Sequence, residues 1–137
     1  ITTGEITDIM KVGSWLIAPY NAQTLKVKVS VVTSSMTDAN DRKTKWECSF
    51  DGANPSSVLC TCPNNVATIP NGLVGKGDSV VVADVTYGYK PLIFDKFMKE
   101  THTSTGGVYT LTEKIYLKPR GACPQLTKED ATKCGCT

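Results

Sequence analysis

Six cysteines in a chain of 137 residues constrain the fold more than any other feature of the sequence. Four of them form two Cys-x-Cys pairs and two stand alone, at Cys48, Cys60, Cys62, Cys123, Cys134 and Cys136. An even number of clustered cysteines is typical of a disulfide framework in an oxidising compartment. Cysteines two apart in an extended segment point the same way and cannot easily bond each other. Each close pair is therefore expected to bond cysteines elsewhere.

A connectivity with little loop-closure cost joins Cys48 to the Cys60/Cys62 region and Cys123 to the Cys134/Cys136 region. The cysteine left in each group then joins the loop to the tail. Bound metal and free thiols are the two rival interpretations. Structural zinc sites usually present Cys-x₂₋₄-Cys, and the single histidine, His102, is near neither pair. We expect disulfides, no metal and no cofactor.

The composition predicts one globular domain over residues 1–137. Hydrophobic residues make up 40% and charged residues 20%, which is ordinary for a folded protein. A formal charge of +2 is too small to indicate a nucleic acid or an anionic membrane as partner. No run approaches the roughly 20 apolar residues of a membrane span. Because the chain begins at Ile1, we expect it to be a mature form or an excised part of a longer protein.

Helical periodicity predicts an amphipathic helix over Thr2–Ile17, ended by Pro19. Thr2 and Glu5 have the spacing of a capping box. A single apolar stripe on a short helix usually packs on a sheet. The prediction therefore puts the side chains of Met10 and Trp15 in the core or at its edge.

After the helix, the apolar residues alternate with polar ones, as in strands. Four segments fit this pattern: Leu25–Val32, a strand through Trp46, Cys48 and Phe50, Ser79–Lys90, and Val108–Lys118. A long loop is predicted over Asp51–Asn71, and a cysteine-rich tail follows Gly121. The first half of Ser79–Lys90 is apolar on both faces, which favours a central position. The predicted fold class is α+β, one N-terminal amphipathic helix packed on an antiparallel sheet of about four or five strands.

No arrangement of residues indicates catalysis. His102 is the only histidine, and the chain has no Gly-x-Ser-x-Gly elbow. Neither Cys-x-Cys has the spacing of a thiol oxidoreductase, and Gly75-Lys76 is followed by Gly77 and a strand, unlike a phosphate loop. The acids of the strands are expected on solvent faces; they include Glu47, Asp84 and Glu113. We expect no enzyme and no small-molecule substrate, although sequence alone does not exclude two converging carboxylates.

Two segments resemble a known family. Val85-Thr-Tyr-Gly-Tyr-Lys-Pro-Leu92 resembles the "V-x-Y-x-Y-x-P-L" stretch of TadE/TadG-type minor pseudopilins of tight-adherence (Tad, or Flp) pili, in their extracytoplasmic part. Ile115-Tyr-Leu-Lys-Pro-Arg120 is similar to the strand with Pro-Arg near the C-termini of those proteins, usually followed by a cysteine, here Cys123. The likeness spans roughly Glu5 to Cys123 and does not cover the extra cysteines or the tail.

The resemblance implies a pilin-like subunit that assists assembly of an adhesive fibre or joins it. It also implies an extracytoplasmic location, in the periplasm or at the bacterial cell surface, and anchoring by a hydrophobic helix upstream of Ile1. The expected partners are other pilus or pilus-assembly subunits. The aromatic residues and prolines of these segments are expected to form part of the structural core and to determine the fold, together with the strand tryptophan; they are Trp46, Tyr87, Tyr89, Pro91, Tyr116 and Pro119.

The alternative is a secreted adhesin or lectin-like module that binds through exposed aromatic residues such as Tyr20, Phe94 and Phe97. Phe94 and Phe97 lie in the segment Lys90–His102, which has many apolar residues for a loop. Either this segment completes the core, or part of it forms an apolar patch that contacts a neighbouring pilus subunit.

Overall fold

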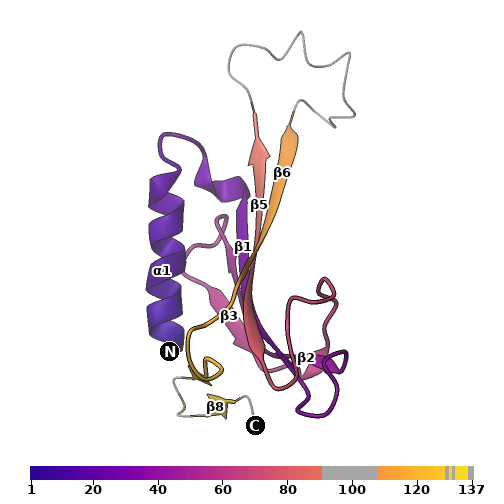
Figure 1. The fold of residues 1–137 in the computed structure, drawn as a ribbon. Coiled ribbons are helices and arrows are strands. Elements are labelled where there is room, and N and C mark those ends of the chain that lie inside the picture. The colour runs from indigo at the N-terminus through magenta and orange to yellow at the C-terminus, as the bar shows by residue number, and fades with distance from the viewer. Residues whose placement is uncertain (91–107, 129, 131, 136–137) are drawn as a thin grey trace.

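The computed structural model describes residues 1–90, 108–128, 130 and 132–135. One helix runs alongside a long antiparallel sheet, and the N-terminus lies at the same end of the molecule as the short strand Lys133–Cys134 (Figure 1). A 3₁₀ turn, Ala22–Thr24, leads from the helix into the sheet. The regular elements, in chain order, are α1 (Thr3–Leu16), β1 (Leu25–Ser34), β2 (Arg42–Asp51), β3 (Val58–Thr61), β4 (Asn65–Val66), β5 (Ser79–Tyr89), β6 (Tyr109–Leu117), β7 (Leu126–Thr127) and β8 (Lys133–Cys134).

The sheet has the strand order β3-β2-β1-β5-β6, and β4 adds a sixth short strand that also pairs with β2. Every pairing within it is antiparallel. The predicted α+β class with one helix on an antiparallel sheet is confirmed. The segment predicted as the loop Asp51–Asn71 instead contains β3 and β4, which are too short to show a clear alternation.

The predicted start of the helix is confirmed in detail. Glu5 N donates to Thr2 Oγ1 at 3.2 Å, and Thr2 N donates to Glu5 Oε2 at 2.8 Å, which completes a capping box. Ile6 and Met10, one turn apart, are buried against the sheet. The prediction for Trp15 is wrong, because its side chain is 72% exposed. Five residues beyond Met10, Trp15 lies on the opposite side of the helix.

Two apolar clusters pack on opposite faces of the sheet. The first lies under α1; its buried members are Ile6, Met10, Leu25, Val31, Trp46, Cys48, Phe50, Leu126 and Cys134. The second lies on the far face and consists of Val32, Ile69, Val74, Val80 and Val82. The central position predicted for Ser79–Lys90 is confirmed, since β5 pairs with β1 on one side and β6 on the other.

A bulge in β2 lets β1 contribute to both clusters. Val31 is opposite Trp46, but Val32 is opposite Thr44, so Lys45 is an extra residue in the ladder. Val31 therefore packs under α1 while Val32 packs on the far face. This end of the sheet is buried on both faces.

Disulfides join the strands and the tail. Cys48 and Cys60 are directly opposite in β2 and β3, with Cα atoms 4.1 Å apart, and are bonded. Cys62 is bonded to Cys134, 72 residues later. These two bonds confirm the predicted bond of Cys48 within its own region and the predicted link from loop to tail. Cys123 is also disulfide-bonded, and no described cysteine is free. Such bonds indicate an oxidising, extracytoplasmic compartment.

Candidate functional site

The aromatic residues predicted to determine the fold differ in burial. Trp46 is only 2% exposed, and its Nε1 donates to the Pro124 carbonyl oxygen at 2.8 Å. Tyr87 and Tyr89 lie on one face of β5, as their spacing predicts, but both remain partly exposed. Tyr87 packs at the edge of the first cluster, while the ring of Tyr89 contacts Tyr20 edge-on, with centroids 6.0 Å apart.

Of the remaining predicted residues, Tyr116 lies on the far face, Pro119 follows β6, and the others lie outside the described part of the chain. Tyr116 is half-buried against the second cluster, and Pro119 is half-buried just after β6. Pro91, Phe94, Phe97 and Cys136 lie outside the described residues. The structure therefore brings Trp46 and Tyr87 to one cluster and Tyr116 to the other.

The far face of the sheet carries cross-strand ion pairs. Lys28 Nζ is 2.8 Å from Glu47 Oε2, and Lys114 Nζ is 3.0 Å from Asp84 Oδ1. The hydrogen bond to Asp84 raises the pKa of Lys114 above its usual value. Each carboxylate already has a lysine partner, so neither is placed as a free acid or base. Exposed pairs of this kind contribute about 0–1 kcal/mol each.

A shallow pocket of about 630 Å³ opens on this far face. Its walls include Lys26, Lys28, Asp51, Asn54 and Asp84. Small-molecule sites are usually lined by apolar and aromatic side chains around a few polar groups. Here nine of the twelve lining residues are polar or charged, so the pocket resembles a hydrated sheet surface more than a ligand site.

Arg42 is a buried cation that the sequence does not distinguish from the surface lysines. Its guanidinium donates to the carbonyl oxygens of Ala39 and Ile69, at 2.8 and 2.7 Å. It also donates to the side-chain oxygens of Asn40 and Asn71, at 3.1 and 3.2 Å. These bonds tie two loops to the start of β2, so the role of Arg42 is to hold the fold. Its basic side chain was the only signal available in the sequence.

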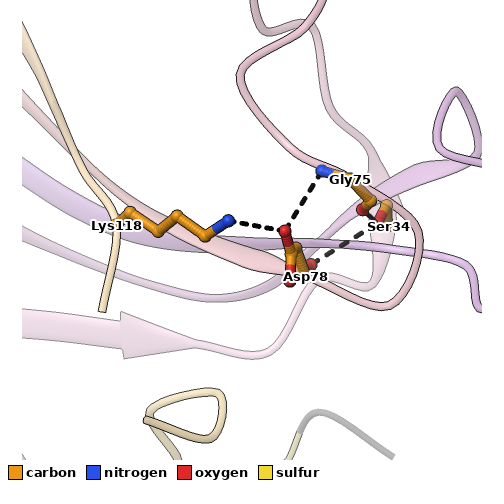
Figure 2. A network of polar contacts seen from close by, with 4 residues as sticks. All are labelled: Ser34, Gly75, Asp78 and Lys118. Atoms are coloured by element: carbon orange, nitrogen blue, oxygen red, sulfur yellow. Dashed lines mark hydrogen bonds and ion pairs between the residues drawn. The ribbon is translucent and has the colours of Figure 1, made fainter. Parts of the chain in front are cut away.

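A second polar network joins the turn before β5 to its neighbours (Figure 2). Asp78 Oδ2 accepts a hydrogen bond from Lys118 Nζ at 2.7 Å and from Gly75 N at 3.4 Å. Ser34 donates from its hydroxyl to the Gly75 carbonyl oxygen, and its backbone N–H donates to the Asp78 carbonyl oxygen at 3.0 Å. The Lys118 ammonium lowers the pKa of Asp78 below its usual value. The contacts fasten the ends of β1 and β6 to this turn.

The face of β6 that lies on the same side of the sheet as α1 is apolar, and no described element covers it. Leu111, Ile115 and Leu117 are 56, 45 and 58% exposed. They are directly opposite Tyr87, Ala83 and Val81, two of which pack against the first cluster. Because opposite residues of an antiparallel pair share a face, these β6 side chains lie on the α1 side.

One side of α1 continues this surface. The opposite side lies beside β3, since Thr3 and Thr7 border the same small depression as Val58 and Cys60. The exposed apolar stripe of the helix is turned away from that depression and hence toward β5 and β6. We call the whole surface the open apolar face; it consists of Ile9, Val12 and Leu16 of α1, Val85 and Tyr87 of β5, and Leu111, Ile115 and Leu117 of β6.

The described part of the chain has two further general features. No group of three or more His, Cys, Asp or Glu side chains among those residues is placed to hold a metal ion. None of the helices described is long and apolar enough to cross a membrane.

Comparisons with known proteins found no family model, curated protein or solved structure that matches the chain.

Proposed function

We propose that this domain is a structural, non-catalytic subunit of a cell-surface fibre, of the minor pilin or pseudopilin kind. The observation that carries the proposal is the open apolar face. Soluble monomers rarely expose a continuous apolar patch larger than a few hundred Å², and larger patches usually mark contacts with other macromolecules. In a subunit of an assembly, contact with a neighbouring subunit would remove such an apolar face from water.

The arrangement of the resembling segments supports the pilin-like interpretation. The "V-x-Y-x-Y" segment forms the end of β5, and the first residues of the segment with Pro-Arg form the end of β6. The two strands are paired neighbours, and because they are antiparallel the two segments lie at opposite ends of the pair. An amphipathic helix precedes the sheet, as the resemblance implies. The disulfides Cys48–Cys60 and Cys62–Cys134 suit a domain that works outside the cytoplasm. In this proposal a hydrophobic helix upstream anchors the domain in the inner membrane.

Deletion of the gene, followed by complementation, tests the proposal. Counts of surface fibres by electron microscopy and measured surface attachment should both fall in the deletion strain and return with the wild-type gene. Complementation with Ile115→Glu should fail, because a charge is placed on the open apolar face. Val66→Glu is the matched control, since Val66 is 80% exposed and lies on β4, away from that face.

The fold of both variants is checked first by their melting curves, because both positions are exposed. A deletion strain with wild-type fibre numbers and attachment would contradict the proposal. Equal loss of fibres with Ile115→Glu and Val66→Glu would show that fibre assembly does not depend specifically on the open apolar face.

A secreted adhesin or lectin-like module is the second candidate, and one observation favours it. Tyr20 is 53% exposed and stacks edge-on with Tyr89, which places two aromatic rings together at the surface. Exposed aromatic pairs are common in binding sites. If Tyr20→Ala abolishes attachment while fibre number and the melting curve stay unchanged, the domain acts as the adhesive element itself.

A further inference from the structure

The sheet is wider than the one helix that packs on it. Five strands spaced about 4.8 Å apart span about 20 Å, whereas a helix with its side chains is about 10 Å across. α1 contacts β2 and lies beside β3. It therefore covers the half of the sheet formed by β3, β2 and β1. Among the described elements none packs on the same side of the half formed by β5 and β6, which is wide enough for one more helix.

The side chains of the uncovered half are those expected under a packed helix. Val85 and Tyr87 are half-buried at the edge of the first cluster, and Leu111, Ile115 and Leu117 continue the apolar surface to the edge strand. Strand faces that meet only water usually carry polar residues at such positions. The apolar stripe of α1 borders this surface on its other side, so an added helix would contact both layers.

The charges at this surface are acidic. Glu113 lies between Leu111 and Ile115 on the same face of β6, opposite Val85. Within the described residues, no lysine or arginine forms an ion pair with it. Glu5 lies on the same side of α1 as Ile9 and Val12, and its hydrogen bonds to Thr2 lower its pKa, so it is charged at neutral pH. An occupant with basic side chains would complement both carboxylates.

A second copy of this chain fits these charges poorly. If α1 of the second copy packed its exposed apolar stripe on the first copy, its Glu5 would lie near Glu113 of the first copy. Asp8, on the neighbouring surface of that helix, would add a second negative charge. Like charges placed together in a partly buried contact oppose association. The charges therefore favour a different partner.

We infer that the open apolar face binds an amphipathic α-helix from another subunit, with a lysine or arginine that pairs with Glu113. The apolar residues of that helix, spaced at i, i+3, i+4 and i+7, would contact Leu111, Ile115 and Leu117. The inference rests on the proposed function, because the partner is taken to be a fibre or fibre-assembly subunit. It is testable on the purified domain without the fibre.

The test uses three fluorescein-labelled peptides of about 18 residues, or about five helical turns. One has a leucine stripe flanked by lysine, the second has glutamate in place of each lysine, and the third has the composition of the first in scrambled order. Fluorescence anisotropy gives the dissociation constant of each. The lysine peptide should bind the wild-type domain about tenfold or more tightly than the other two.

Four variants then locate the site. Ile115→Ser and Leu111→Ser should each weaken binding of the lysine peptide about tenfold. Leu59→Ser and Val66→Ser are matched controls, because both residues are exposed and lie on β3 and β4, and they should bind like the wild type. A fifth variant, Glu113→Lys, should reverse the preference, so that the glutamate peptide becomes the tighter ligand. Melting curves show that each variant is folded.

Three results would overturn the inference. The scrambled peptide binds as tightly as the lysine peptide, or Leu59→Ser weakens binding as much as Ile115→Ser. Alternatively, sedimentation shows a wild-type dimer that Ile115→Ser dissociates, in which case a second copy occupies the face. Peptide binding and fibre counts are independent readouts. If the purified domain binds the lysine peptide but the deletion strain has wild-type fibre numbers, the binding site is supported and the proposed function is contradicted.

Discussion

Trp46 donates a hydrogen bond from its indole nitrogen to the carbonyl oxygen of Pro124, 78 residues away in the sequence and 2.8 Å away in space. This contact joins the middle of β2 to the segment between β6 and β7. Leu126, two residues beyond Pro124, is fully buried in the same cluster, and Cys134 is buried beside it. The tail therefore contributes to the core under α1 as well as carrying disulfides.

Trp46→Phe should lower the free energy of unfolding by about 1–3 kcal/mol, because it removes a buried hydrogen bond and part of the ring volume. Trp46→Ala should cost about 3–5 kcal/mol. Urea unfolding followed by circular dichroism measures both. Trp15→Phe is the matched control, and because Trp15 is exposed it should change stability by less than about 0.5 kcal/mol. An equal effect at the two tryptophans would mean that Trp46 is not the buried one.

The two disulfides that join described residues should contribute unequally to stability. Loop-closure entropy predicts about 3 kcal/mol for Cys48–Cys60, with a sequence separation of 12, and about 4 kcal/mol for Cys62–Cys134, with a separation of 72. Paired substitution of each bond by serine, followed by urea unfolding, measures both values. The serine pair at Cys62 and Cys134 should be the less stable. A larger loss from the Cys48 and Cys60 pair would show that the longer bond adds little constraint.

Local signals in the sequence predicted where the helix and strands lie more accurately than they predicted how these elements pack together. The capping box of Thr2 and Glu5, the alternation of β1 and the run of valines in β5 depend on near neighbours, and all are found in the structure. Which side of α1 meets the sheet depends on residues far away. The helix has apolar residues on more than one side, so periodicity alone did not separate the buried Met10 from the exposed Trp15.

The open apolar face illustrates the same limit. Leu111, Ile115 and Leu117 alternate with polar residues just as the core positions of β1 do, and from the sequence they look equally buried. Their exposure follows from the position of α1 over the other half of the sheet. That position is set by the contacts of Ile6 and Met10 with the first cluster, which no local pattern encodes.

Two glycines should respond to alanine in opposite ways. Gly52 is buried at the end of β2, and a Cβ there would lie 1.8 Å from the Ala22 carbonyl oxygen. Since that neighbour is backbone, Gly52→Ala should cost about 3 kcal/mol or more, or prevent folding. Gly13 lies inside α1, and a Cβ added there would have open space around it, with no contact within 4 Å. Gly13→Ala should therefore stabilise the protein by about 0.5–1 kcal/mol.

Thermal melting of the two glycine variants measures these changes in stability, and soluble yield is a second readout for Gly52→Ala. A Gly52→Ala protein with wild-type stability would mean that the 3₁₀ turn at Ala22–Thr24 does not pack closely on the end of β2. A destabilised Gly13→Ala protein would indicate an unrecognised contact on that side of the helix.

The ion pair between Asp78 and Lys118 should make stability depend on pH in the acid range. Lys118, with a smaller effect from the Gly75 N–H, holds the folded-state pKa of Asp78 below its usual value. A group whose pKa is depressed by folding stabilises the protein above its unfolded-state pKa, about 3.9, and loses that contribution as pH falls through the lower folded-state value. Asp78→Asn should therefore melt below the wild type at pH 6, and the difference should shrink as the pH falls below about 4.

Lys118→Met tests the cause of that pH dependence. It removes the ammonium that lowers the pKa of Asp78 while keeping an unbranched side chain of similar length at the end of β6. In the Lys118→Met background, adding Asp78→Asn should change the melting temperature by nearly the same amount at every pH from about 2 to 6, because little of the shift then remains. A pH-dependent difference that persists in full without Lys118 would assign the effect to the Gly75 N–H, which donates to the same carboxylate oxygen at 3.4 Å.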